Sequence, residues 1–223
     1  MKPTIAIDGP AGAGKSTVSR RLAQALGLRY VDTGAMYRVV GVLADEAGVD
    51  LADAAALATL CDTLSLLFDE QPDGVHVLAN GRDLTRAIRT AAAGQLASKV
   101  STQPVVRERL VALQRRLGAG GGVVMEGRDI GTVVLPDATV KIFLVASTGE
   151  RARRRWAELT ARGESADLAQ IEREIEERDV RDRTRAHSPL VPAADALLVD
   201  TTSESVEEVV ARVRNLVAGQ GNS

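Results

Sequence analysis

A glycine-rich segment near the start of the chain carries the residues best suited to binding phosphate. Gly9-Pro10-Ala11-Gly12-Ala13-Gly14-Lys15-Ser16 fits the pattern G-x-x-x-x-G-K-S. Glycines let backbone N–H groups point at phosphate oxygens, and a following helix adds the positive end of its dipole. Lys15 is expected to reach the β- and γ-phosphates and the Ser16 hydroxyl to bind Mg²⁺. The loop, continued to Thr17, therefore predicts a site for Mg²⁺ and a nucleoside triphosphate such as ATP.

The residues on either side of this loop predict the strand and the helix that the motif requires. The run TIAID (4–8) is typical of a buried strand, and the segment 15–26 has apolar residues at every fourth position before Gly27. A tight glycine turn with an incidental lysine is the alternative interpretation. The correct flanking elements favour the phosphate-binding loop, or P-loop.

Further strands and helices alternate along the chain. Short runs rich in β-branched residues predict buried parallel strands at 29–32, 123–126, 140–146 and 196–199. Between them, helices are predicted at 34–48, with Thr33 as N-cap, at 104–117, and twice within 148–185 with a break near 162–165. The expected fold is α/β, a P-loop NTPase-type parallel sheet of about five strands flanked by helices.

One stretch interrupts this alternation. The runs 64–70 and 75–79 are separated by turn residues 71–74 and followed by Asn80-Gly81. These are hairpin signals. They predict a small antiparallel insert in an otherwise alternating chain.

Composition bounds the organisation of the protein and its partners. The 223 residues are expected to form one domain over 1–220, with a flexible polar tail at 219–223. A net charge of −2 argues against a nucleic-acid partner, and no apolar run approaches a membrane span, so we expect a cytoplasmic protein with no membrane partner. Cys61 stands in an apolar helical context as a structural thiol, and the two histidines lack neighbours at metal-ligand spacing.

A P-loop does not identify the phosphoryl acceptor. The chain has no Asn-Lys-x-Asp guanine-reading motif and no basic extension suited to a nucleic-acid motor. A compact metabolite kinase fits best. A kinase for another monophosphate or a small alcohol, and a P-loop regulatory switch, stay open as alternatives.

Several motifs in order resemble those of bacterial cytidylate kinases: GPAGAGKST (9–17), DTGAMYR (32–38), IRT (88–90), the segment 98–107, EGRDIGTVVLPDATVKIFLVAS (126–147) and ERDVRDRTRAHSPLVPAADALLVDT (177–201). The resemblance covers nearly the whole chain. It implies transfer of the γ-phosphoryl group of ATP, with Mg²⁺, to CMP and dCMP. It also implies an acceptor-binding insert near 62–100 and a short lid near 148–166. We expect a monomer.

The resemblance also implies roles for individual residues. Lys15, Arg128 and Arg185 would be catalytic. The residues around the acceptor would be Thr33, Arg38, Ser98, Arg107, Arg128, Asp129, Arg178, Asp182 and Arg185. Of these, Ser98, Arg107 and Asp129 would surround the cytosine. Ser16 and Thr33 stand where some relatives carry glycine and serine.

Position along the chain supports several of these roles independently. Arg38, Arg128 and Asp129 follow predicted strands at their carboxyl ends, where open α/β sheets bind ligands. Arg178, Asp182 and Arg185 are spaced i, i+4, i+7, which predicts one helix face. Without the resemblance, a salt-bridged solvated face would be the ordinary interpretation of that spacing. The same alternative applies to the arginines of the lid, Arg151, Arg154 and Arg155.

Overall fold

The computed structural model describes residues 2–71 and 74–220. The chain forms two compact units. The first comprises Met1–Tyr30 and Gly118–Ser223, and the second comprises Val31–Leu117. The predicted acceptor-binding insert, residues 62–100, falls inside the second unit.

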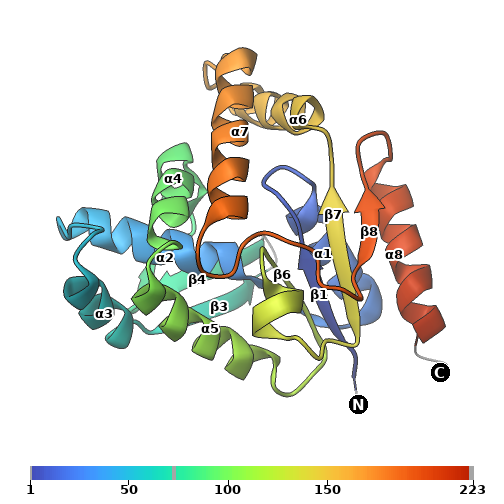
Figure 1. Ribbon diagram of the computed structural model, residues 1–223, viewed down its shortest axis with the longest axis horizontal. Helices are drawn as coiled ribbons and strands as arrows, with labels where there is room; N and C mark the ends of the chain where they lie inside the picture. Colours follow the sequence, from blue (N-terminus) through green and yellow to red (C-terminus); the bar gives the residue numbers. More distant parts are fainter. Residues whose placement is uncertain (1, 72–73, 221–223) are drawn as a thin grey trace. The chain divides into compact units, whose positions relative to one another are not determined.

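A five-stranded sheet organises the first unit, in the order β2-β6-β1-β7-β8 (Figure 1). Its strands are β1 (Thr4–Asp8), β2 (Arg29–Asp32, of which the first two residues belong to this unit), β6 (Val123–Gly127), β7 (Val140–Val145) and β8 (Leu197–Asp200). Strand β1 pairs in parallel with β6 and β7, and β7 pairs in parallel with β8. The predicted parallel sheet is confirmed, with β1 and β2 at the predicted residues.

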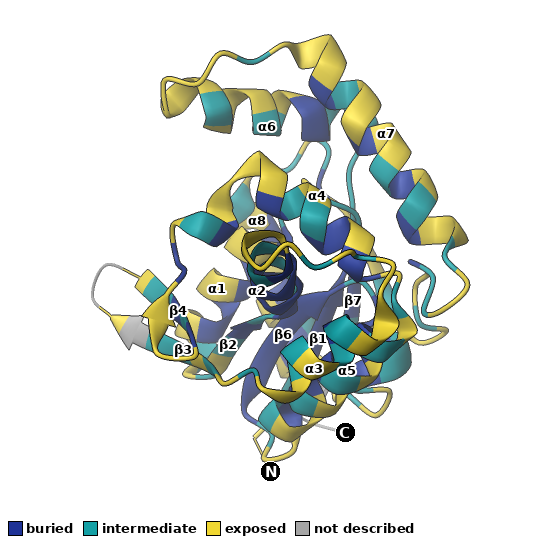
Figure 2. Ribbon diagram, turned by 90° about the vertical axis from the view of Figure 1, so that its left-hand side faces the viewer, coloured by how far each residue is buried: buried dark blue, intermediate teal, exposed yellow. Residues whose placement is uncertain are grey.

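Two helices cover the sheet and complete its core. Helix α1 (Lys15–Leu26) and helix α8 (Val206–Gln220) pack together, and their apolar residues join those of the strands. Val18 and Leu22 of α1 are fully buried there, as are Ile5 and Ile7 of β1. Strands β1, β6 and β7 are almost wholly buried (Figure 2). Burial on both faces accounts for their near-continuous apolar sequences.

Three further elements of the first unit carry candidate site residues. After β6 comes η2 (Ile130–Val134), a single π-helical turn. Helices α6 (Thr148–Ala161) and α7 (Leu168–Thr184) form a pair that packs through Ala152, Ile171 and Ile175. Their predicted break near 162–165 is confirmed. The predicted lid, residues 148–166, corresponds to α6 and the segment after it.

The second unit combines helices with a small antiparallel sheet. Its helices are α2 (Thr33–Glu46), α3 (Ala54–Asp62), η1 (Ala87–Arg89), α4 (Ala91–Val100) and α5 (Pro104–Gly118, whose last residue lies past the unit boundary). The sheet has the order β3-β4-β5, with β3 (Leu66–Gln71), β4 (Gly74–Ala79) and β5 (Arg82–Asp83). The predicted hairpins are present. Asn80 and Gly81 both have positive φ, as a two-residue hairpin loop requires.

Some boundaries differ from the sequence predictions. Asp32, not Thr33, caps α2: its side chain accepts a hydrogen bond from the Ala35 N–H, and Thr33 is the first helical residue. A carboxylate accepts such a bond strongly and suits the positive end of a helix. Helix α8 continues to Gln220, so residues 219–220 of the predicted tail are helical. The rest of that tail and residues 72–73 of the predicted 71–74 turn lie outside the described residues.

Two features that the described residues lack bear on function. Over 2–71 and 74–220, no helix combines the length and the apolar character needed to cross a membrane. Within the same ranges, no three His, Cys, Asp or Glu side chains gather in an arrangement that could hold a metal ion.

Candidate active site

The phosphate-binding loop joins β1 to α1, as the motif requires. Gly9 shows why glycine is needed. Its φ is +146°, and a Cβ there would lie 2.1 Å from the carbonyl oxygen of Leu144. Helix α1 then begins at Lys15, after Gly14 in the left-handed conformation. The loop therefore presents the backbone and helix N-terminus that a phosphate group needs.

Lys15 is held inside the loop with an unusually acidic ammonium group. It is buried, and its Nζ donates a hydrogen bond to the Pro10 carbonyl oxygen at 2.7 Å. Burial and the positive charge of Arg128 lower the pKa of Lys15 from 10.5 to about 7, with a further contribution from Arg178 and partial compensation by Glu126. Burial and the neighbouring positive charges thus both disfavour the charged form of Lys15, and negative phosphate oxygens beside it would favour that form.

Ser16 faces a carboxylate from the neighbouring strand. Its Oγ donates to Oε2 of Glu126 at 3.1 Å, and the Tyr30 hydroxyl donates to the other oxygen of Glu126. Glu126 is buried at the carboxyl end of β6. Hydroxyl and carboxylate oxygens are the hard donors that Mg²⁺ prefers. These groups fit the predicted Mg²⁺ role of Ser16 and add Glu126 to it.

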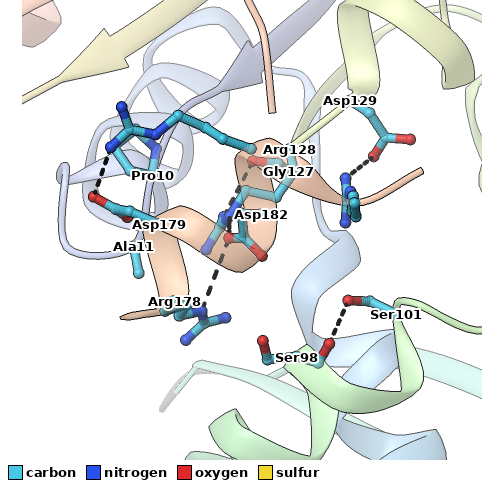
Figure 3. A network of polar contacts seen from close by, with 12 residues as sticks. Pro10, Ala11, Ser98, Ser101, Gly127, Arg128, Asp129, Arg178, Asp179 and Asp182 are labelled. Carbon is cyan, nitrogen blue, oxygen red and sulfur yellow. Dashed lines mark hydrogen bonds and ion pairs between the residues drawn. The ribbon is translucent and has the colours of Figure 1, made fainter. Parts of the chain in front are cut away.

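Arginines from two elements converge on the buried carboxylate of Asp182 (Figure 3). Arg128, after β6, donates from Nε to Oδ2 of Asp182 at 3.0 Å, and Nε of Arg178 lies 4.0 Å from the same oxygen. Burial favours the neutral acid, but Arg128, Arg178 and Arg185 outweigh it and hold the pKa of Asp182 below its ordinary value. One carboxylate therefore orients the Arg128 guanidinium and lies beside that of Arg178, and the positive charge of the two arginines exceeds its own.

Asp129 and Arg185 form a second buried contact. Nη2 of Arg185 lies 3.8 Å from Oδ1 of Asp129, and both side chains are about 5% exposed. Helix α7 ends at Thr184, and the backbone of Arg185 is extended. The Arg185 side chain donates a hydrogen bond to the Ser188 carbonyl oxygen. The predicted single helix face is therefore correct for Arg178 and Asp182 but wrong for Arg185. A turn back after the helix, not helical periodicity, directs Arg185.

Asp8 links the strand before the phosphate loop to the turn that follows β6. Its two carboxylate oxygens accept the N–H groups of Ile130 and Gly131 at 2.9 and 2.8 Å. Burial raises the pKa of Asp8 to about 6. The two backbone hydrogen bonds oppose this shift, Asp129 adds to it, and Lys15 opposes it slightly.

The three lid arginines have different environments. Arg151 is buried, donates to both oxygens of Asp179 at 3.1 and 2.6 Å, and donates to the carbonyl oxygen of Ala11 in the phosphate loop at 3.1 Å. Arg154 donates to the side chain of Glu150 and to Thr201. Arg155 contacts Glu158 at 3.3 Å. The solvated-face interpretation is wrong for Arg151, which ties α6 and α7 to the loop.

The remaining candidates lie in the second unit. Arg38 forms an ion pair with Asp32 at 2.6 Å. Thr33, the residue after Asp32, is buried. Arg107 is buried, with its guanidinium 5.9 Å from the ring centre of Tyr37 and 3.3 Å from its hydroxyl.

Ser98 is also in the second unit, on α4. It is buried, and its carbonyl oxygen accepts a hydrogen bond from the Ser101 hydroxyl at 2.9 Å (Figure 3).

Sequence reasoning missed several residues that organise these sites. Asp8 and Glu126 are polar residues at the carboxyl ends of β1 and β6, and that position alone could have singled them out. Asp32 and Tyr37 stand inside the DTGAMYR motif beside named residues. Asp179 carries no comparable signal, because a carboxylate in a charged helix is ordinarily solvated.

A parallel α/β sheet with a lysine-bearing glycine loop between its first strand and helix defines a P-loop nucleotide-binding protein. Arg128 and Arg178, beside Asp182 and close enough to lower the pKa of Lys15, concentrate positive charge in the same unit.

Comparisons with known proteins identify the family. Residues 5–219 match the family model described as Cytidylate kinase. A cytidylate kinase of Pelotomaculum thermopropionicum is 57% identical over 93% of this chain and 92% of its own. One of Geobacillus kaustophilus is 53% identical over 96% of each chain. The chain belongs to the cytidylate kinase family. A solved structure of an uncharacterized protein from Eubacterium ventriosum has a TM-score of 0.50 at 12% identity, covers 96% of this chain and 97% of its own, and shows likeness of fold alone.

Proposed function

We propose that this protein transfers the γ-phosphoryl group of ATP to CMP and dCMP, giving ADP and the corresponding diphosphate. The observation that carries this proposal, beside family membership, is the crowding of positive charge around Lys15. Arg128 and Arg178 both lower its pKa, and they sit at the Asp182 carboxylate in the same unit. Such a concentration of positive charge suits phosphate groups on two substrates.

The residues of the first unit would bind and orient the phosphates. The loop from Gly9 to Thr17 would surround the donor phosphates with backbone N–H groups, and Lys15 would bridge its outer phosphates. Arg128 and Arg178, beside Asp182, and Arg185, beside Asp129, would offset the charge on the transferring group. In-line transfer needs positioning and charge stabilisation rather than a strong base, so no general base is assigned.

Ser16 and Glu126 would hold Mg²⁺, Ser16 directly and Glu126 directly or through water. Their oxygens lie 3.1 Å apart, and Tyr30 orients the carboxylate. When bound, the ion would neutralise part of the phosphate charge.

The family resemblance implies that Asp129, Ser98 and Arg107 recognise the base. Cytosine offers an exocyclic amino donor beside acceptors, so a carboxylate suits the amino group and hydroxyl or guanidinium donors suit the rest. Arg38 and Thr33 would bind the CMP phosphate and sugar. We propose that the second unit, with the insert 62–100, and the lid 148–166 close over the substrates. We also propose a cytoplasmic monomer of pyrimidine nucleotide metabolism, without a nucleic-acid partner.

A coupled assay of ADP production with CMP, dCMP, UMP, AMP and shikimate tests this function. Turnover that is highest with CMP and dCMP supports it. Preference for another monophosphate or an alcohol would support the alternative kinases. Slow hydrolysis independent of every acceptor would support a regulatory switch.

One variant tests base recognition separately. Asp129 also faces Arg185, so it could merely shape its turn. Because uracil presents a carbonyl where cytosine presents its amino group, loss of the carboxylate should cost CMP about 1–3 kcal/mol relative to UMP. Asp129→Asn should therefore lower kcat/KM for CMP and narrow the CMP-to-UMP ratio roughly ten- to two-hundred-fold. An unchanged ratio removes Asp129 from base recognition.

A further inference from the structure

Asp8 lies where strand β1 meets the phosphate loop. It is the last residue of β1, immediately before Gly9, and its side chain is buried. Its two oxygens each accept a backbone N–H, from Ile130 at 2.9 Å and from Gly131 at 2.8 Å. These contacts join segments more than 120 residues apart in the sequence. All of them lie within the first unit.

The two N–H groups belong to the turn that carries the candidate acceptor residues. Ile130 and Gly131 open η2, directly after Arg128 and Asp129. Hydrogen bonds from two consecutive peptide groups to one carboxylate are charge-assisted, and together they fix both position and orientation.

We propose that Asp8 is a positioning residue that holds the Arg128–Gly131 turn at a fixed place relative to the phosphate loop. This inference rests on the proposed function and deepens it. Lys15 lies in the loop that follows Asp8, and Asp129 precedes the amides that Asp8 binds. The Asp8 carboxylate therefore sets the separation between Lys15, which would hold the donor phosphates, and Asp129, which would recognise the acceptor base. In-line transfer is sensitive to such separations at the level of an ångström.

The acceptor side of the site should depend on this contact more than the donor side. The phosphate loop is also held by its glycine conformations and by the α1 N-terminus, whereas Asp8 binds the turn at its first two amides. Asp8→Asn keeps the size of the side chain but turns an amino group toward one of the two N–H donors. One hydrogen bond is lost, and two donors then face each other.

The test measures kinetics and amide exchange on the full chain carrying Asp8→Asn. We expect KM for CMP to rise about tenfold and KM for ATP to change less than twofold. The ratio of kcat/KM for CMP to kcat/KM for UMP should fall. Exchange of the Ile130 or Gly131 amide hydrogen, followed by NMR, should accelerate at least tenfold. Equal changes in the two KM values, a change in KM for ATP alone, or unchanged exchange would overturn the proposal. A change in KM for ATP alone would show instead that Asp8 acts through the charge of Lys15.

A matched control is available in the second unit. Asp53 also accepts two consecutive backbone N–H groups, from Ala55 and Ala56, both at 3.0 Å, at the start of α3, but through the single oxygen Oδ1, which asparagine keeps, so Asp53→Asn controls for the loss of charge. Asp53→Asn makes the same chemical change and should leave both KM values and the base preference unchanged. A matching rise in KM for CMP in this control would overturn the proposal.

A second variant covers the case in which Asp8→Asn does not fold. Asp8→Glu keeps the carboxylate and its charge but lengthens the side chain by one methylene, which moves the oxygens away from their positions opposite the Ile130 and Gly131 amides. It should raise KM for CMP selectively as well, and equal effects on both substrates would contradict the inference. The exchange measurement needs no turnover. A wild type that fails to phosphorylate CMP would therefore refute the proposed function, while the amides report on the Asp8 contact separately.

Discussion

Replacing Lys15 by methionine should remove catalysis and at the same time stabilise the fold. The ammonium group is buried against positive charge from Arg128 and Arg178. A shift of its pKa from 10.5 to about 7 corresponds to about 5 kcal/mol of unfavourable free energy in the folded state. Loss of the hydrogen bond to Pro10 offsets roughly 1 kcal/mol of the gain. Lys15→Met should therefore raise the free energy of unfolding by roughly 2–4 kcal/mol near pH 6.5.

The effect of pH on this difference has a definite sign. The pKa of Lys15 is lower in the folded state, so between about pH 7 and 10.5 the unfolded chain binds more protons. The destabilisation by Lys15 is complete below about pH 7 and disappears as the pH approaches 10.5. The advantage of Lys15→Met should therefore shrink steadily with rising pH and be close to zero by about pH 10.

Urea unfolding of both proteins from pH 6.5 to 10, without nucleotide, measures this difference. Thermal unfolding near pH 6.5 should show a Tm higher by about 5–15 °C in the variant. With ATP, Mg²⁺ and CMP present, kcat should fall by several orders of magnitude. A variant no more stable than the wild type at pH 6.5, or an advantage that persists at pH 10, would refute the burial argument. Near-normal turnover would refute the role of Lys15 in transfer.

Two further predictions concern buried carboxylates. Arg151→Met should lower the free energy of unfolding by about 3 kcal/mol, because it leaves the buried Asp179 with only the longer contact to Arg183. Adding Asp179→Leu should recover most of this loss, as measured by urea unfolding. Additive losses in the double variant would contradict this. Glu126→Gln should raise the Mg²⁺ concentration needed for half-maximal activity roughly tenfold without changing KM for CMP, because a neutral amide binds Mg²⁺ more weakly. An unchanged Mg²⁺ titration would remove Glu126 from the metal site.

The sequence alone determined the elements whose signals are local. Strand β1 and helix α1 each have a regular apolar pattern that ends at a glycine, Gly9 and Gly27. The short strand β2 follows within a few residues. The Asn80-Gly81 turn specified its hairpin because those residue types accept positive φ. The ordered motifs indicated the family, and the strand ends placed Arg128 and Asp129 at the edge where open α/β sheets bind ligands.

Only the tertiary structure decided which charged groups meet. Arg185 leaves the α7 face because the chain turns after Thr184, and no helical periodicity encodes that turn. Asp8 finds the amides of Ile130 and Gly131 only because parallel pairing sets β1 beside β6. Arg151 contacts Asp179 because α6 packs on α7. A charged side chain looks the same in sequence whether it is solvated or buried. Its partner, and with it its pKa and its role, is fixed by contacts between segments far apart in the chain.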